Sequence, residues 1–191
     1  INLVPKEGGN TFSGEVSGIY TNEHLQSNNL TDALRAQGLS EPNKAYYVYD
    51  INPTFGGPVK ANRLWFFTAP RFAGNRNSVP GVYFNKTQGT PFYTPDLTKP
   101  SYRSDRMRSI AGRLTLQASA KNKINGFVDI QSLPLIGRGD FVAQEAQSGF
   151  LFWPNTLTQV TWSSPRTSKL LLEAGFSWMH TTYPNQRHPS V

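Results

Sequence analysis

The stretch that decides the fold is residues 109–131, SIAGRLTLQAS-AKN-KINGFVDIQ, in which apolar and polar side chains alternate. In its first half, the even positions from Ile110 to Ala118 are apolar or glycine, and most odd positions are polar. After the polar residues 120–122 the alternation resumes. The apolar or glycine positions of this second half are Ile124, Gly126, Val128 and Ile130. Successive side chains of a β-strand point to opposite faces, so the pattern predicts two amphipathic strands joined by a short turn.

The same period-two pattern recurs along the rest of the chain. Residues 156–163 and 169–180 form a second predicted hairpin, and residues 47–58 and 64–72 form a third. Residues 11–21 alternate as well. The start of 64–72 is apolar at every position, so periodicity does not assign its faces. The sequence therefore predicts an all-β fold, an antiparallel meander of long hairpins with about seven strands.

Short and long connections alternate between these strands. The turns at 58–63, 120–122 and 164–167 are short, whereas the segments near 22–44, 74–105 and 132–154 are long, polar and rich in Pro, Gly and Asn. Loops of more than about 15 residues are uncommon in compact soluble domains. Short turns at one end and long loops at the other are typical of outer-membrane barrels, whose strands need about 9–11 residues to cross a bilayer.

We therefore expect the meander to be part of a transmembrane β-barrel. A soluble β-sandwich, whose apolar face would pack on a second sheet, or a partial barrel that binds carbohydrate, remains the alternative. Inside the first long loop, Thr31 is expected to cap a short helix over residues 32–36 that Gly38 ends.

The composition of the 191 residues limits the other classes. Charged residues make up only 16% of the chain, against about 25% in an average soluble domain, while aromatic residues reach 13%. No apolar run approaches the roughly 18 residues of a membrane-spanning helix. Cysteine is absent, so no disulfide or thiolate metal site is expected. The chain begins at Ile1 without a recognisable targeting segment, so we expect a mature piece or a fragment of a longer protein.

The net charge of +7 and the pI near 9.8 raise the question of a nucleic-acid partner. The Lys and Arg residues are scattered, however, and the nearest approach to a cluster is Arg103, Arg106 and Arg108. No basic helix or nucleic-acid motif accompanies them, so we expect no nucleic-acid partner. Contact with anionic lipid headgroups explains the same charge equally well.

Two motif blocks carry a resemblance to a known family. The opening residues 1–14, INLVPKEGGNTFSG, resemble the junction between plug and barrel of TonB-dependent outer-membrane receptors. Residues 52–59, NPTFGGPV, followed by 63–67, RLWFF, resemble an early barrel hairpin of their Oar-like, carboxypeptidase-regulatory-like branch. Under this resemblance, residues 1–10 are the end of the plug domain and its linker, and residues 11–191 are the N-terminal portion of the barrel.

The resemblance implies a plugged barrel of about 22 strands that imports a bulky ligand across the bacterial outer membrane. This chain would contribute barrel wall and extracellular ligand-binding loops. Its implied partners are the remaining barrel and plug, the TonB complex that acts through the missing N-terminal part, and outer-membrane lipid.

No enzyme, cofactor or metal site is expected. The three histidines, His24, His180 and His188, lack metal-ligand spacing. Residues 163–164 lack the glycine context of a nucleophilic serine, and residues 137–140, GRGD, contain too few glycines for a phosphate loop. Asp129 and Glu173 are the first candidates for the less favoured alternative, a carboxylate-dependent glycoside hydrolase.

Aromatic residues in the long loops are the candidate ligand-binding residues, because such rings stack on sugars and anchor apolar ligands. The predicted set is Tyr83, Phe84, Phe92, Tyr93, Tyr102, Phe152 and Trp153.

Overall fold

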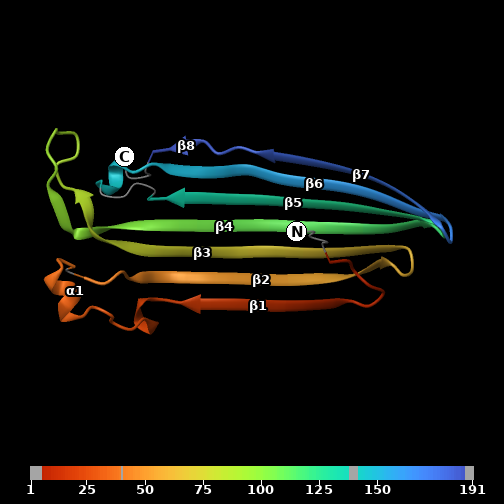
Figure 1. Cartoon of the computed structure of the whole chain (residues 1–191), viewed down its shortest axis with the longest axis horizontal. Helices are drawn as coiled ribbons and strands as arrows, with labels where there is room; N and C mark the ends of the chain where they lie inside the picture. The colour runs from red at the N-terminus through yellow and green to blue at the C-terminus, as the bar shows by residue number, and fades with distance from the viewer. Residues whose placement is uncertain (1–5, 40, 138–141, 188–191) are drawn as a thin grey trace.

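In the computed structural model, which describes residues 6–39, 41–137 and 142–187, the chain forms one antiparallel sheet (Figure 1). The long strands are β1 (Ser13–Thr21), β2 (Ala45–Lys60), β3 (Leu64–Asn85), β4 (Pro95–Ser119), β5 (Asn122–Ile136), β6 (Gly149–Thr167) and β7 (Leu170–Thr181). Each long strand pairs with its neighbour in sequence, which confirms the all-β meander of long hairpins. A two-residue strand, β8 (Asn185–Gln186), pairs with the start of β6.

The connections distinguish two ends of the sheet. At the turn end, on the right of Figure 1, residues 61–63, 120–121 and 168–169 join neighbouring strands. At the loop end, on the left, longer segments join β1 to β2, β3 to β4 and β5 to β6. Among the described residues, β1 pairs only with β2 and β7 only with β6, so the sheet is open at both edges.

The first long loop is confirmed between β1 and β2. It contains the 3-10 helix η1 (Glu23–Leu25) and the helix α1 (Asp32–Ala36). Thr31 caps α1 by accepting a hydrogen bond at Oγ1 from the backbone N–H of Leu34, 3.3 Å away. Gly38 follows the helix with a φ of 94°, the left-handed conformation that glycine adopts readily.

The limits predicted for the other two long loops are wrong. The expected loop 74–105 shrinks to residues 86–94, and the expected loop 132–154 loses both of its ends to β5 and β6. Residues 75–78, for example, pair continuously with residues 102–105. Strand pairing depends on main-chain hydrogen bonds and does not require alternating side chains. The strands therefore extend beyond the residues in which apolar and polar side chains alternate.

The strand register assigns every side chain to one of two faces. Leu114 pairs with Phe66 and with Gly126, and Gly126 in turn pairs with Val160. Residues opposite one another on paired strands share a face. The apolar face defined in this way carries Val16, Tyr20, Tyr49, Ile51, Phe55, Leu64, Phe66, Phe72, Ile110, Leu114, Leu116, Ile124, Val128, Ile130, Val160, Trp162, Leu172, Phe176 and Trp178.

The opposite side, the polar face, carries Glu15, Ser17, Asp50, Asn52, Thr54, Arg71, Ser109, Arg113, Thr115, Lys123, Asn125, Asp129, Gln131, Asn155, Gln159, Thr161, Glu173 and Ser177. The register also settles the start of β3, which periodicity leaves open. Leu64 and Phe66 lie on the apolar face, whereas Trp65 and Phe67 lie on the polar face.

The sheet has no apolar core. None of the hydrophobic residues in the described part of the chain is buried; the exposed fractions of Val16, Ile110 and Phe176 are 74%, 60% and 64%. The described residues form one sheet, without the second layer that a sandwich requires. None of the helices in the described ranges is long and apolar enough to cross a membrane.

Aromatic rings of the apolar face lie over glycines of neighbouring strands. A Cβ atom at Gly74 would lie 2.9 Å from ring atoms of Tyr49, and one at Gly57 would lie within 3 Å of the ring of Phe12. Because glycine has no Cβ, the ring contacts the backbone directly at these two positions. Such contacts help to fix the register between neighbouring strands.

Candidate functional site

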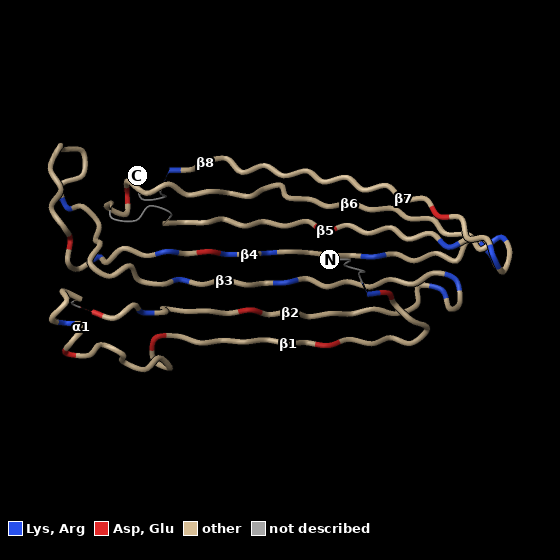
Figure 2. Tube along the Cα trace, viewed as in Figure 1, with Lys and Arg blue, Asp and Glu red and all other residues tan. Residues whose placement is uncertain are grey.

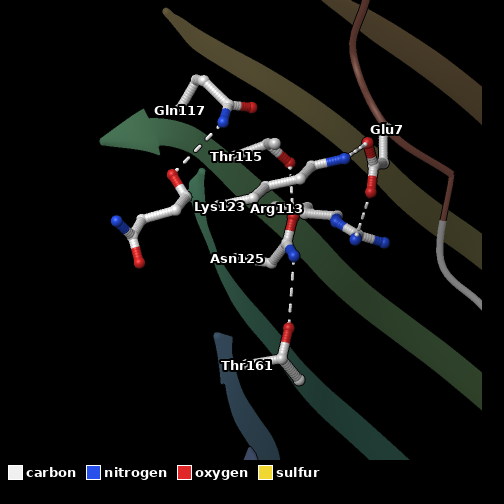
Figure 3. A network of polar contacts seen from close by, with 8 residues as sticks. Glu7, Arg113, Thr115, Gln117, Lys123, Asn125 and Thr161 are labelled. Atoms are coloured by element: carbon white, nitrogen blue, oxygen red, sulfur yellow. Dashed lines mark hydrogen bonds and ion pairs between the residues drawn. The ribbon is translucent and has the colours of Figure 1, made fainter. Parts of the chain in front are cut away.

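Charged side chains on the polar face form ion pairs. Arg71 donates to Asp50 from Nε to Oδ1 at 3.0 Å and from Nη2 to Oδ2 at 2.6 Å. Arg113 and Lys123 both bind Glu7, each with an N–O distance of 2.7 Å (Figure 3). The Arg113 side chain is only 9% exposed, so solvent screens its ion pair less than it screens a pair on an open surface.

A hydrogen-bonded row of polar side chains crosses the sheet from β4 to β7. Asp129 accepts from Ser109 Oγ at 2.7 Å and from Gln131 Nε2 at 2.6 Å. Gln131 Oε1 accepts from Asn155 Nδ2 at 3.0 Å, and Asn155 Oδ1 accepts from Thr181 Oγ1 at 2.7 Å. The row supplies each of these side chains with a partner on the polar face.

A second row lies closer to the turn end. Thr115 Oγ1 donates to Asn125 Oδ1 at 3.0 Å, and Asn125 Nδ2 donates to Thr161 Oγ1 at 3.2 Å. Figure 3 shows this row beside the ion pairs of Glu7. Both rows present amide and hydroxyl groups along the same face, which therefore suits contact with water or with polar protein surface.

The segment that precedes β1 lies on the polar face (Figure 1). Besides the ion pairs of Glu7, the Lys6 ammonium lies 5.8 Å from the centre of the Phe67 ring. Asn10 Oδ1 accepts from Trp65 Nε1 at 2.7 Å and from the backbone N–H of Asn62 at 2.9 Å. Contacts of three residue types thus hold this short segment against β3, β4 and β5.

At the loop end, the segment between β5 and β6 is fastened to β3 and β4. It contains the 3-10 helix η2 (Gln144–Ala146). Gln144 is fully buried; its Oε1 accepts from Ser101 Oγ and, at 2.7 Å, from the backbone N–H of Tyr102. Glu145 Oε1 accepts from the backbone N–H of Asn85 at 2.7 Å. These contacts give the loop end a defined shape.

The seven predicted aromatic residues do not come together in one site. Phe92 and Tyr93 line a hollow of about 520 Å³ between the β3–β4 loop and residues 142–143. The Tyr93 hydroxyl donates to the backbone carbonyl of Tyr83 at 3.3 Å, and the Tyr83 hydroxyl donates to Glu41 at 3.1 Å. This hollow brings together two predicted residues, with Tyr83 beside it.

Phe84 and Tyr102 line a different hollow, of about 600 Å³, and their ring centres are 6.3 Å apart. The Arg76 guanidinium lies 3.7 Å from the centre of the Tyr102 ring and 5.6 Å from that of Tyr46. Tyr47 and Lys99 complete the basic and aromatic part of the lining. This hollow combines aromatic rings with positive charge.

The remaining two predicted residues lie elsewhere, at the start of β6. Phe152 stacks on Tyr183 with 5.8 Å between the ring centres, and Trp153 is 49% exposed. Sequence reasoning also missed Tyr46, Tyr47 and Arg76, which belong to the second hollow. Tyr47 and Arg76 continue the alternation of β2 and β3, whereas Tyr46 lies at a register shift between Ala45 and Tyr47. The unexpected length of β3 explains why they were not placed near Tyr102.

The two candidate carboxylates lie far apart on the polar face. Asp129 and Glu173 share this face, but β6 lies between their strands and their register positions are six residues apart, about 20 Å. No group of three or more potential metal-ligating side chains occurs in the described ranges. His180 stacks on Trp178, 5.7 Å between ring centres, whereas His188 and residues 138–140 lie outside the described residues.

Two shifted pKa values lie at the loop end, well beyond the apolar residues of β3 and β4. The hydrogen bond to Glu41 raises the pKa of the Tyr83 phenol. The hydrogen bond from Thr98 lowers the pKa of Asp96. Both groups therefore keep their ordinary charge states at neutral pH, Tyr83 neutral and Asp96 ionised.

In comparisons with known proteins, no protein-family description, curated protein or solved structure matches the chain. The fold and the polar contacts of the chain are therefore the observations from which its function is argued.

Proposed function

We propose that this chain is part of the wall of an outer-membrane β-barrel, in a receptor of the TonB-dependent kind. The apolar face would meet lipid, and the polar face would line the lumen. The observation that carries the proposal is the continuous apolar face, which extends over seven strands and has no buried hydrophobic residue among the described ones.

The size of the apolar face argues for a membrane. Seven strands about 4.8 Å apart make a surface roughly 29 Å wide, and the eight residue steps from Leu64 to Phe72 span about 26 Å. The resulting area, on the order of 750 Å², exceeds the few hundred Å² that soluble monomers normally expose. Its length is near the apolar band of about 25 Å on outer-membrane barrels.

The polar face supports the assignment of a lumen. Its amide and hydroxyl rows would contact water inside a barrel, and the segment at Lys6–Asn10 already lies on it. In the receptor family that residues 1–14 resemble, the plug lies inside the barrel, on this same side of the wall. The resemblance and the contacts of Glu7 therefore agree on which face is internal.

The open edges require further strands. β1 and β7 present unpaired main-chain groups, which are costly in lipid and are removed in barrels by closure. We therefore propose that additional strands of a longer protein complete the barrel, with the short turns in the periplasm and the loop end outside the cell.

The loop end would contribute to capture of a bulky ligand. The hollow lined by Phe92 and Tyr93 offers apolar and aromatic surface, and the contacts of Gln144 and Glu145 preform its surroundings. Phe152 and Trp153 would contribute at the neighbouring connection. No step of this proposal is catalytic.

Adjacent residues on opposite faces provide the test. These 191 residues contain no cysteine, so single variants Val160→Cys and Thr161→Cys, or Phe176→Cys and Ser177→Cys, each add one site for a spin label, with any cysteine outside these residues replaced by serine. The full-length protein would be reconstituted in phosphatidylcholine vesicles. Electron paramagnetic resonance then measures collisions with oxygen, which dissolves in lipid, and with a nickel chelate, which stays in water.

We expect oxygen to relax the labels at 160 and 176 and the nickel chelate to relax those at 161 and 177. Efficient nickel relaxation at all four positions would overturn the proposal, because the apolar face would then be in water. Protection of 160 and 176 from both reagents would also overturn it, and would favour the soluble sandwich, in which protein covers that face.

A further inference from the structure

We propose that Arg76, Arg106 and Arg108 form a binding patch for the phosphate headgroup of an anionic lipid, at the loop end of the apolar face. The inference rests on the proposed membrane location and adds a specific lipid contact to it. Figure 2 shows Lys and Arg segments on the loop-end halves of β3 and β4, where the patch lies.

The register places all three guanidinium groups on the apolar face. Arg108 pairs with Phe72 and Arg106 with Gly74, while Arg76 pairs with Tyr47. Residues two apart on one strand, and diagonal neighbours on paired strands, lie about 7–8 Å apart. Arg106 therefore lies between the other two, while Arg76 and Arg108 are about 13 Å apart along the strands. The flexible Arg106 side chain can share an anionic group with Arg108 on one side or with Arg76 on the other.

Not every arginine of the sequence cluster belongs to this patch. Arg103 pairs with Asn77 and so lies on the polar face, whereas Arg76 joins the patch from β3 although it is distant in sequence. The patch is thus a product of the register and could not be identified from spacing alone.

The three groups lack an acidic partner. Within the described ranges, the guanidinium groups of Arg76, Arg106 and Arg108 form no hydrogen bond or ion pair, and Arg76 Nε is buried without an acceptor. Tyr102 and Tyr46 offer Arg76 only their ring faces. Arginine binds phosphate through two parallel N–H groups, so these side chains retain the donors that such an anion needs.

The surroundings specify a lipid over a soluble anion. Along β4, the patch continues directly into Ile110, and across the sheet Arg108 faces Phe72. Tyr49 lies in the row of Arg106, at the boundary where tyrosine is enriched beside a bilayer. A ligand seated here meets positive charge on one side and exposed apolar surface on the other, which fits a phosphate attached to acyl chains.

Native mass spectrometry of the full-length protein provides the test. The protein would be held in a non-ionic detergent doped with equal amounts of dioleoyl phosphatidic acid and dioleoyl phosphatidylcholine. The double variant Arg106→Gln, Arg108→Gln removes two charges of the patch. Arg166→Gln removes one charge near the turn end, where the side chain lies far from the patch, and serves as the control.

We expect the wild-type protein to retain phosphatidic acid selectively and the double variant to lose about tenfold in apparent affinity, with Arg166→Gln unchanged. The double variant Arg106→Lys, Arg108→Lys keeps the charge but loses the paired N–H groups, so it should keep part of the selectivity, more than the Gln variant does. Its loss of selectivity to the same extent as the Gln variant would overturn a charge-based site.

Equal retention of both lipids by the wild-type protein would overturn the inference, as would an equal loss in Arg166→Gln. Displacement of phosphatidic acid by inorganic phosphate at equal concentration would also overturn it, because the site would then recognise a soluble anion. Oxygen accessibility at position 160, measured on the same protein, separates the two proposals. A lipid-exposed apolar face without phosphatidic acid selectivity would refute the patch alone.

Discussion

The two faces of the sheet carry arginines in opposite situations. On the polar face, Arg71 and Arg113 have carboxylate partners at 2.6 and 2.7 Å. On the apolar face, Arg106 and Arg108 have no such partner among the described residues. The polar face therefore satisfies its charges within the chain, whereas the apolar face depends on something outside it, both for its arginines and for its hydrocarbon surface.

One backbone register produces both situations. Because side chains alternate along a strand, a slip of one residue would exchange the faces of that strand and place ion-pairing residues among the exposed aliphatic ones. Neighbouring residues such as Val160 and Thr161 are consequently in different surroundings although their main chains are equivalent. Substitutions at such neighbours test the difference directly.

The largest effect is expected when a charge is placed in the middle of the apolar face. Val160→Lys should destabilise the protein in vesicles by about 2–4 kcal/mol, the cost of a lysine on the lipid face of a barrel near the bilayer midplane. Thr161→Lys, on the polar face, should cost about 1 kcal/mol or less, mainly from loss of the hydrogen bond donated by Asn125.

Denaturant unfolding of the vesicle-bound protein, followed by tryptophan fluorescence, measures both free energies. Equal costs at the two positions would contradict the assignment of the faces to different media. A larger cost at 161 than at 160 would reverse the assignment.

An intermediate effect is expected when a carboxylate is removed from the polar face, so that its basic residues lose an ion-pair partner as on the apolar face. Glu7→Gln removes the carboxylate that binds Arg113 and Lys123. Both ion pairs are lost, so the segment before β1 should be held less tightly, although solvent limits the contribution of the partly exposed pair with Lys123. A spin label at Gly9→Cys, where no atom lies within 4 Å of a new Cβ, reports the mobility of this segment.

The matched control is Glu15→Gln, which makes the same change on the polar face at a side chain without an ion pair among the described residues. We expect the label to become more mobile in Glu7→Gln and to remain unchanged in Glu15→Gln. If neither variant alters the spectrum, the ion pairs do not hold the segment.

The faces of β4, β5 and β7 were predictable from sequence because their alternation is nearly complete. The even positions of residues 110–118 are apolar or glycine, and β5 repeats the pattern. The loop-end parts of β3 and β4 were not predictable, since residues 75–78 are polar on both faces. No apolar core contacts them, so no alternation of apolar side chains marks them as strand. Pairing there depends on main-chain hydrogen bonds, which leave no periodic signal.

The candidate sites were less predictable than the fold. Phe92 and Tyr93 were proposed from their place in a loop and line one hollow. Arg76 was not considered because it lies in a part of β3 that the sequence pattern does not predict as strand. The partner of Glu7 could not be found from spacing, since Arg113 is 106 residues away. Contacts of this kind follow from register, which is set by the whole sheet.

The smallest expected effect distinguishes two glycines within the apolar face itself. Gly126 has no atom within 4 Å of a new Cβ, whereas at Gly74 the Cβ would lie 2.9 Å from the Tyr49 ring. Gly126→Ala should therefore stabilise the protein by about 0.5–1 kcal/mol, because alanine loses less backbone entropy on folding and fits the open site.

Gly74→Ala should not stabilise the protein, because the new methyl group would displace the Tyr49 ring from the backbone. Denaturant unfolding in vesicles compares the free energies of the two variants. Stabilisation of equal size at both positions would show that the ring moves without cost. The apolar face would then be a loosely packed surface over its whole area. A difference between the two variants would instead show that ring packing fixes the face next to Arg106, where the proposed lipid contact begins.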